Sequence, residues 1–204
     1  MNRQEICENT VLKDTPSKLT PEQYLARERS AEFKSEYYHG EIYAMAGASR
    51  EHNQISSNIT ASLATQLLEQ PCSVYASDMK VWIDKAHKYT YPDVLVACEP
   101  QLFEDEHTDV LLNPRVIIEI LSDSTESYDR GLKFFHYQRI DLLCEYLLIS
   151  QKFCHVEKYE RQANNLWAYS EFHEMGDEVT INAVNCKISL REIYRKVSLK
   201  ESII

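Results

Sequence analysis

The sequence predicts an α/β fold in which helices flank a central mixed sheet. Two short runs rich in valine, isoleucine and leucine, Tyr91–Cys98 and Arg115–Ser122, are typical of strands buried on both faces. A long amphipathic helix precedes these runs and a shorter helix follows them, an order that favours a layered α/β domain. The tail over residues 150–185 is rich in strand-forming segments, which predicts a β-rich C-terminal extension.

The chain should begin with an arm and a capped helix. Residues 1–17 show no apolar period, and we expect them to form a flexible N-terminal arm. Thr20 is then placed to cap a helix that runs to about Glu32. Pro21 stands at its first position and Gln23 three residues after the cap, which is a capping box.

A hairpin and a long helix come next. Glu36–Met45 is expected to fold back on itself at His39-Gly40, because glycine readily supplies the positive φ of a two-residue turn. Ser49 opens a helix predicted to reach Gln70, with Pro71 ending it. Its apolar stripe consists of Ile55, Ile59, Leu63, Leu67 and Leu68.

The middle of the chain should supply the strands of the sheet. Val74–Ile83 is predicted as one strand with a bulge near Ser77-Asp78, where the apolar alternation changes parity. A charged turn over Asp84–Thr90 leads to the Tyr91 strand, and a polar loop over Glu99–Asn113 leads to the Arg115 strand.

A helix and further strands complete the domain. Asp129–Ile140 is predicted as a helix whose aromatic residues Phe134, Phe135 and Tyr137 lie in the core. Strands are expected over residues 145–150, 153–159, 165–172 and 179–184, and a short helix over residues 190–196 closes the chain.

Composition limits the class of protein. The 204 residues suit a single domain, which we place at residues 18–198, and the net charge of −10 argues against non-specific coating of nucleic acid but not against a nuclease. No run is long and apolar enough for a membrane span or a signal peptide, so we expect a cytoplasmic protein. The six scattered cysteines are then expected to be reduced thiols, without the close pairs of a structural zinc site.

Two acids stand where an apolar pattern asks for none. Asp93 lies at the start of the first buried run and Glu119 in the middle of the second. A buried carboxylate without a partner costs several kcal/mol or gives up its charge. A divalent cation between the two acids is the partner that we favour, and backbone amides or a lysine are the alternative.

The chain resembles the Uma-two family of endonucleases, within the restriction-endonuclease-like superfamily named for its Pro-Asp … Asp/Glu-x-Lys motif. The matching pieces occur in order between about residues 19 and 150. They are His39-Gly40-Glu41-Ile42, Ser49 with His52, Ser77-Asp78-Met79-Lys80-Val81, Pro92-Asp93-Val94, Glu119-Ile120-Leu121-Ser122, Asp129-Arg130-Gly131-x-Lys133, Tyr137 and Glu145-Tyr146-Leu147.

The resemblance implies a three-layer α/β/α core and a phosphodiesterase centre dependent on Mg²⁺ or Mn²⁺, with Asp93 and Glu119 as metal ligands. The sequence departs from the superfamily motif at Leu121, where lysine is expected. Lys133, on the following helix, is our candidate for that role, and Lys80 is the second choice. The alternative for Lys133 is a simple i,i+4 ion pair with Asp129.

Other residues are weaker candidates. His52 could add to the site, although it is equally typical of a surface histidine near a helix cap. Glu41 could be a third carboxylate, an interpretation that we favour slightly over a solvated strand residue. Asp78 is more typical of a bulge than of a ligand. Three basic residues, Arg130, Lys85 and Lys88, could form a rim that docks nucleic acid, or could belong to an ordinary solvated face. The remaining histidines are expected to be surface residues.

The predicted function is therefore a Mg²⁺-dependent endonuclease acting on DNA as a homodimer, with catalytic residues Asp93, Glu119 and Lys133. One alternative is a nuclease-like scaffold that binds nucleic acid or a protein without cutting, which the absent motif lysine and the acidic charge favour. Another is a nuclease that acts on RNA.

Overall fold

A six-stranded mixed sheet forms the centre of the structure, a computed structural model that describes residues 18–200. Its strand order is β11-β10-β9-β8-β6-β3, and β8 and β9 are parallel while the other neighbours are antiparallel. The strands are β3 (Cys72–Ala76), β6 (Val94–Cys98), β8 (Val116–Leu121), β9 (Glu145–Ser150), β10 (Val156–Arg161) and β11 (Trp167–Phe172). The predicted central mixed sheet is confirmed. The arm expected over residues 1–17 lies outside the described residues.

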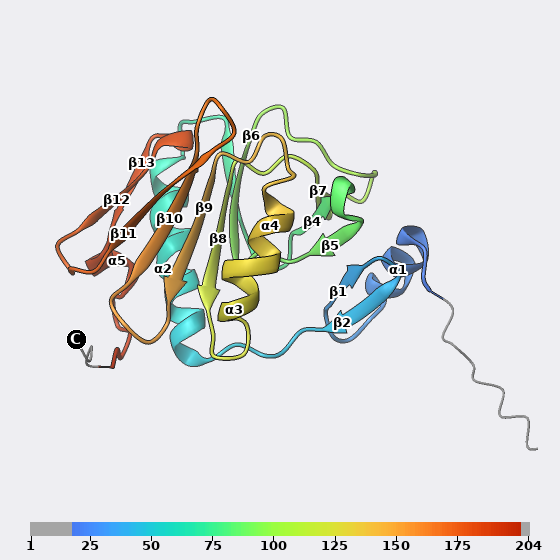
Figure 1. The fold of residues 1–204 in the computed structure, drawn as a ribbon, viewed down its shortest axis with the longest axis horizontal. Helices are drawn as coiled ribbons and strands as arrows, with labels where there is room; N and C mark the ends of the chain where they lie inside the picture. The colour runs from blue at the N-terminus through green and yellow to red at the C-terminus, as the bar shows by residue number, and fades with distance from the viewer. Residues whose placement is uncertain (1–17, 201–204) are drawn as a thin grey trace, which may run out of the picture.

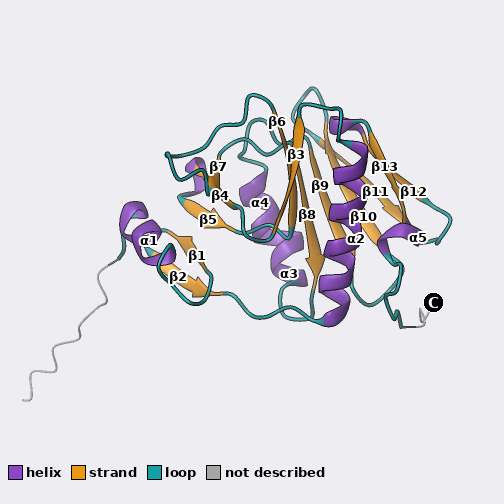
Figure 2. Cartoon of the chain, turned by 180° about the vertical axis from the view of Figure 1, so that it is seen from behind, coloured by secondary structure: helices purple, strands orange, loops and turns teal. Residues whose placement is uncertain are grey.

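Helices cover both faces of this sheet, as Figures 1 and 2 show from opposite sides. Val116, Ile118 and Ile120 of β8 face one core, which α2 (Arg50–Gln66) covers. The small sheet of β12 (Glu178–Ile181) and β13 (Cys186–Ser189), with η3 (Asn182–Val184) and α5 (Leu190–Ile193), completes that side. Ile117 and Leu121 face the opposite core, beneath the continuous helical segment α3 (Glu126–Tyr128), η2 (Asp129–Lys133) and α4 (Phe134–Tyr137). The three-layer α/β/α arrangement is thus confirmed.

A second sheet stands beside the first, in the order β2-β1-β5-β4-β7. It comprises β1 (Ser35–Tyr38), β2 (Glu41–Ala44), β4 (Lys80–Ile83), β5 (Lys88–Thr90) and β7 (Val110–Leu111), with α1 (Pro21–Glu28) and η1 (Asp84–Ala86) packed nearby. Its core is a group of stacked tyrosines, Tyr24, Tyr37 and Tyr89.

The second sheet corrects two predictions. The single bulged strand over Val74–Ile83 is wrong, because the chain leaves the large sheet at Ala76 and enters the second sheet at Lys80. The change of parity in the sequence marks this change of sheet. The charged turn over residues 84–90 is also wrong in part, since its end is the buried strand β5.

Local signals set the starts of the first two helices as predicted, whereas α1 ends at Glu28, four residues before the expected Glu32. The Thr20 side chain accepts from the Gln23 N–H and the Gln23 side chain accepts from the Thr20 N–H, so the capping box is confirmed. Ser49 caps α2, which ends at Gln66, four residues earlier than expected. His39 and Gly40 form the hairpin turn with φ of 48° and 92°.

Three further expectations fail. His136, expected at the surface, is buried at 2% exposure, because its ring packs against Tyr38 of β1. Cys72 and Cys98 lie opposite each other on β3 and β6 and form a disulfide, so the expectation of reduced thiols is wrong for this pair. Phe135 is 51% exposed, whereas Phe134 and Tyr137 are buried as predicted, because only two of the three aromatic residues face the sheet. No described helix has the length and apolar character needed to cross a membrane.

Candidate functional site

The register of β6 and β8 brings the two predicted acids together. Val94 pairs with Ile118, so Asp93, one residue before β6, lies opposite Glu119. Asp93 Oδ2 accepts a hydrogen bond of 2.7 Å from the Ile120 N–H. The same oxygen lies 3.1 Å from His52 Nε2, on the first turn of α2. Asp93 is therefore held by two layers of the structure: by β8 of the sheet, through the Ile120 N–H, and by α2, through His52.

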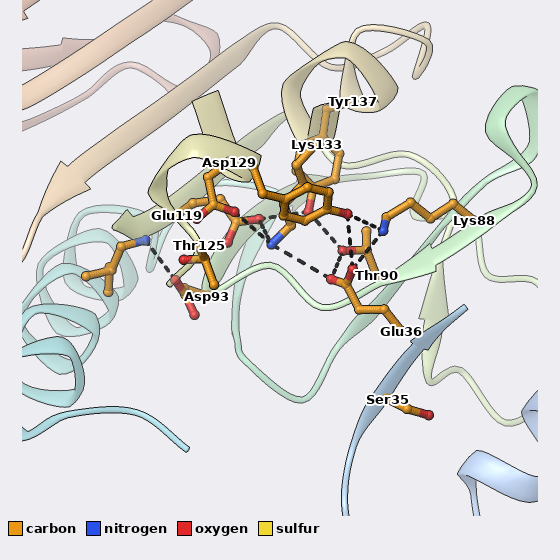
Figure 3. Close-up of polar contacts among 12 residues, drawn as sticks. Ser35, Glu36, Lys88, Thr90, Asp93, Glu119, Thr125, Asp129, Lys133 and Tyr137 are labelled. Carbon is orange, nitrogen blue, oxygen red and sulfur yellow. Dashed lines mark hydrogen bonds and ion pairs between the residues drawn. The ribbon is translucent and has the colours of Figure 1, made fainter. Parts of the chain in front are cut away.

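Glu119 points the other way, toward the helical segment that covers the odd-numbered face of β8 (Figure 3). Its Oε1 lies 2.8 Å from Lys133 Nζ and accepts a hydrogen bond of 2.8 Å from the Tyr137 hydroxyl. Lys133 Nζ also lies 3.5 Å from Asp129 Oδ1, so the i,i+4 pair exists but is the longer contact. Asp129–Lys133 forms a π-helical turn, a feature common at functional sites.

A third acid reaches the same lysine from the second sheet. Glu36 Oε1 on β1 lies 3.8 Å from Lys133 Nζ, and Glu36 Oε2 lies 2.7 Å from Lys88 Nζ. Thr90 and Tyr128 donate to the Glu36 carboxylate. We call Glu36, Asp93, Glu119, Asp129, Lys88 and Lys133 the acid–lysine cluster.

Sequence reasoning did not give Glu36 a role. It resembled an ordinary polar position in a short hairpin, and only the pairing of β1 with β5 shows that it is buried. Asp129 and Tyr137 were recognised as parts of a motif, but their contacts with Lys133 and Glu119 depend on how the helical segment returns over the sheet.

The acid–lysine cluster carries more negative than positive charge. Four carboxylates face two ammonium groups, which leaves an excess of two negative charges when all are ionised. Burial raises the pKa of Glu119 to about 8, and the neighbouring charges of Asp93 and Asp129 add to this rise while Lys133 opposes it. Burial also raises the pKa of Asp129.

Lys133 responds in the opposite sense. Burial disfavours its charge, yet Glu119, Glu36 and Asp129 together raise its pKa well above the ordinary value. The ammonium group therefore stays charged, and the negative excess rests on the acids.

These residues fit a divalent cation that prefers oxygen ligands. Within residues 18–200, Asp93 Oδ1 and Glu119 Oε2 accept no hydrogen bond, whereas the other oxygen of each carboxylate is held in place. Mg²⁺ is usually bound by one or two carboxylates and keeps its other positions for water and phosphate. Two carboxylates on adjacent strands, each with one oxygen that accepts no hydrogen bond, match that requirement.

The model of the Uma2 family, described as "Putative restriction endonuclease", matches residues 21–191. The chain belongs to the Uma2 family. Two Synechocystis proteins named as uncharacterized, sll1609 and slr1290, are similar to this Uma2 chain. The first is 39% identical over 83% of this chain and 95% of its own length, and the second 34% identical over 87% and 92%.

A solved structure shares the fold. The crystal structure of a putative nuclease belonging to DUF820, from Anabaena variabilis, superimposes with a TM-score of 0.72 at 17% identity. The match covers 86% of the Uma2 chain and 97% of the other. Family and fold together are those of a restriction-endonuclease-like nuclease.

In this Uma2 protein the weaker candidates lie apart from the acid–lysine cluster, with two exceptions. His52 lies beside Asp93, and Lys88 is a buried member of the cluster rather than part of an exposed rim. Lys80 pairs with Asp109 at 2.8 Å, and Glu41 is exposed and accepts from the Tyr43 hydroxyl.

The remaining basic candidates of the Uma2 chain are engaged by acids. Lys85 lies 2.6 Å from Asp141, and Arg130 lies 2.8 Å from Glu157 and 3.2 Å from Glu126. Asp78 is exposed and pairs with Lys34.

Proposed function

We propose that this Uma2 protein is a divalent-metal-dependent endonuclease that hydrolyses phosphodiester bonds of DNA. The observation that carries the proposal is the arrangement of Asp93 opposite Glu119 with the Lys133 ammonium on the Glu119 carboxylate. Membership of the family and the shared fold support a nuclease. The two carboxylates that face each other across β6 and β8 support the dependence on a divalent cation.

Asp93 and Glu119 are the proposed ligands of Mg²⁺ or Mn²⁺. Such an ion, when bound, lowers the pKa of a coordinated water and offsets the charge of the phosphate. The Ile120 N–H fixes the Asp93 carboxylate, and the Tyr137 hydroxyl fixes that of Glu119. Each acid therefore presents one free oxygen in a defined direction, and its side chain need not change rotamer when the ion binds.

Lys133 is proposed to fill the role of the lysine missing at Leu121. Its ammonium group, kept charged by the surrounding acids, donates to the attacking water or to a phosphate oxygen. The water oxygen forms a bond to phosphorus while the bond from phosphorus to the 3′ oxygen breaks. The attacking water loses a proton to the solvent, and the 3′ oxygen takes up a proton from the solvent and leaves as a hydroxyl.

The exposure of the side chains favours one direction of approach. Asp93 and His52 are 17% and 15% exposed, whereas Glu119 and Lys133 are 3% and 8% exposed. We therefore propose that the phosphate enters over Asp93, with His52 orienting that carboxylate. Arg130 and Lys85, at 35% and 57% exposure, are the remaining candidates for contact with the DNA backbone.

Two further parts of the proposal concern assembly and location. A homodimer would let each subunit cut one strand, and analytical ultracentrifugation of the full chain tests it: a monomer at micromolar concentration contradicts it.

A cytoplasmic location is proposed because DNA is the proposed substrate. Thiol trapping in cell extracts would show whether Cys72 and Cys98 form their disulfide there.

Plasmid nicking with Mg²⁺ or Mn²⁺ tests the function. Asp93→Asn and Glu119→Gln should each lower the rate roughly 100-fold or more, since a lost ligand removes several kcal/mol of transition-state stabilisation. Asp78→Asn, an exposed acid paired with Lys34, is the matched control and should cut at the wild-type rate. Cleavage that survives both ligand changes would sink the assignment.

A scaffold without catalysis is the second candidate, and one observation favours it. Lys133 Nζ contacts three carboxylates, so its charge is already balanced within the protein. Calorimetry with Mn²⁺ separates the two functions, because a scaffold needs no cation at Asp93 and Glu119. An RNA substrate in the same nicking conditions distinguishes a ribonuclease.

A further inference from the structure

A second group of potential metal ligands lies at the edge of the large sheet, on β10 and β11. His155, Glu171 and His173, here called the outer histidine cluster, bring one ligand atom each to within 4.8 Å of one another. Val156 pairs with Phe172, so His155 and His173 face each other across the two strands. Glu171 stands two residues before His173 and so lies on the same face. The sheet itself therefore aims all three side chains at one point.

Each histidine nitrogen lies near one oxygen of Glu171, at a distance close to the spacing of two ligands around zinc. His155 Nε2 lies 3.5 Å from Glu171 Oε2, and His173 Nε2 lies 3.4 Å from Glu171 Oε1. Both exceed the usual 2.7–3.2 Å of a hydrogen bond. Two atoms bound tetrahedrally at about 2.0–2.1 Å from one zinc ion lie roughly 3.3–3.5 Å apart. The two imidazole rings are stacked, with an interplanar angle of 9° and centroids 4.6 Å apart, so one ring must turn about its side-chain torsions for both nitrogens to face one ion.

One ligand atom is buried without a partner. His155 Nε2 is inaccessible to solvent and makes no hydrogen bond in the described part of the chain. A buried polar atom that lacks a partner costs free energy, so a group that bonds to this nitrogen would remove the cost.

The surrounding residues hold the ligands in position. The Tyr194 hydroxyl accepts from the His155 N–H and donates to the His155 carbonyl oxygen. Asp177 Oδ2 accepts from the His173 N–H at 3.0 Å. The Tyr169 hydroxyl donates to Glu171 Oε2 at 2.8 Å, the kind of outer contact that orients a ligating carboxylate.

We propose that the outer histidine cluster binds a divalent transition metal of the zinc class, at a site separate from the acid–lysine cluster. Two imidazoles and one carboxylate suit Zn²⁺ and are poor ligands for Mg²⁺. Three protein ligands leave a fourth position for water, and the side chains of Glu171 and His173 are about half exposed. Cys154, a neighbour in sequence, packs against the core on the opposite face and is not a ligand.

The site lies on the same sheet face as Glu119. Glu119 of β8 pairs with Leu148 of β9, which pairs with Glu157 of β10, which pairs with Glu171 of β11. Three steps between strands separate the two acids by roughly 14 Å. The two sites therefore lie on the same face of the sheet but share no ligand.

Calorimetric titration with Zn²⁺ at pH 7.5 tests the proposal. The full-length Asp93→Asn protein serves as the background, so that binding at the acid–lysine cluster does not contribute. One ion per chain should bind. His155→Ala, His173→Ala and Glu171→Gln should each weaken the affinity by about tenfold or more, and Tyr169→Phe by up to about tenfold.

His107→Ala is the matched control. His107 Nδ1 lies 3.3 Å from Asp105 Oδ1, so it is also an exposed histidine beside a carboxylate, but no second histidine joins it. This variant should bind zinc as tightly as its background. The absence of zinc binding, or binding that the three ligand variants leave unchanged, would overturn the proposal. Because no nuclease assay is involved, its failure is independent of the proposed function.

Discussion

The acid–lysine cluster and the outer histidine cluster lie on one face of one sheet but solve opposite problems. The first is buried, rich in carboxylates and partly neutralised by lysines. The second is partly exposed and rich in imidazole, and no lysine within residues 18–200 pairs with its Glu171. Burial makes charge expensive, so the inner acids need cationic partners within the protein. Glu171 and His173 are about half exposed to water, which screens their charge, so they need no cationic partner. The same β-scaffold can thus present hard oxygen ligands near its centre and nitrogen ligands at its edge.

Removal of the central lysine should give the largest effect. Lys133→Met leaves Glu119, Asp129 and Glu36 without their shared cation and should lower the free energy of unfolding at pH 8 by about 3–5 kcal/mol. It should also slow plasmid nicking roughly 100-fold. Urea denaturation and the nicking assay measure the two effects. A fully stable variant would show that the acids are not held by this lysine.

A buried histidine near the acid–lysine cluster should make the free energy of unfolding depend on pH. Burial, with Lys88 and Arg139 nearby, lowers the pKa of His136 to about 4 from an ordinary value of 6.5. The unfolded chain then binds the proton more readily, so the stability conferred by the neutral ring is complete above pH 6.5 and is lost as the pH falls toward 4. The loss attributable to this residue should reach about 3 kcal/mol.

Urea denaturation between pH 7 and pH 4 measures this loss. His136→Phe should remove that part of the pH dependence, while His173→Phe, at the exposed outer cluster, should leave it in place. Equal pH profiles for wild type and His136→Phe would contradict the predicted pKa shift.

Zinc bound at the outer histidine cluster should stabilise the protein, by less than the loss of Lys133 destabilises it. At a free Zn²⁺ concentration 100 times the dissociation constant, the native state gains about 2.7 kcal/mol. For a domain of this size that gain raises the midpoint of thermal unfolding by roughly 5–10 °C. The His155→Ala protein should lose the increase, and EDTA should abolish it. An equal rise in both proteins would place the ion elsewhere.

The smallest effect is expected at an exposed ion pair. Lys85 lies 2.6 Å from Asp141, which is a shorter contact than that of Lys133 with Glu119. The side chains of Lys85 and Asp141 are, however, both more than half exposed. Lys85→Met should therefore change the free energy of unfolding by less than about 1 kcal/mol. A loss comparable to that of Lys133→Met would show that distance rather than burial sets the strength of these pairs.

The sequence predicts where helices and turns begin better than it predicts which strands pair with one another. The caps at Thr20 and Ser49 and the His39-Gly40 turn act over three or four residues, and all are confirmed. The division of residues 74–83 between two sheets was missed, because the register of a strand depends on residues far away in the chain. The disulfide was missed for the same reason: Cys72 and Cys98 meet only once β3 pairs with β6.

The candidate site shows the same limit. Asp93 and Glu119 were singled out because an acid in an apolar run is conspicuous, and their roles stay predictions. Glu36 gave no such signal, since its burial arises from the pairing of β1 with β5 and from contact with Lys133 of the helical segment. The outer histidine cluster was also invisible in the sequence, where His155 and His173 are 18 positions apart. Only the β10–β11 register brings them face to face.

The most direct test of this account is a crystal structure of the full-length protein soaked with Mn²⁺, with anomalous scattering to locate the ion. The account predicts an anomalous peak bonded to the free oxygens of Asp93 and Glu119, with Lys133 still beside Glu119. A site without Mn²⁺ between these two acids, in crystals where the ion binds elsewhere on the chain, would contradict it.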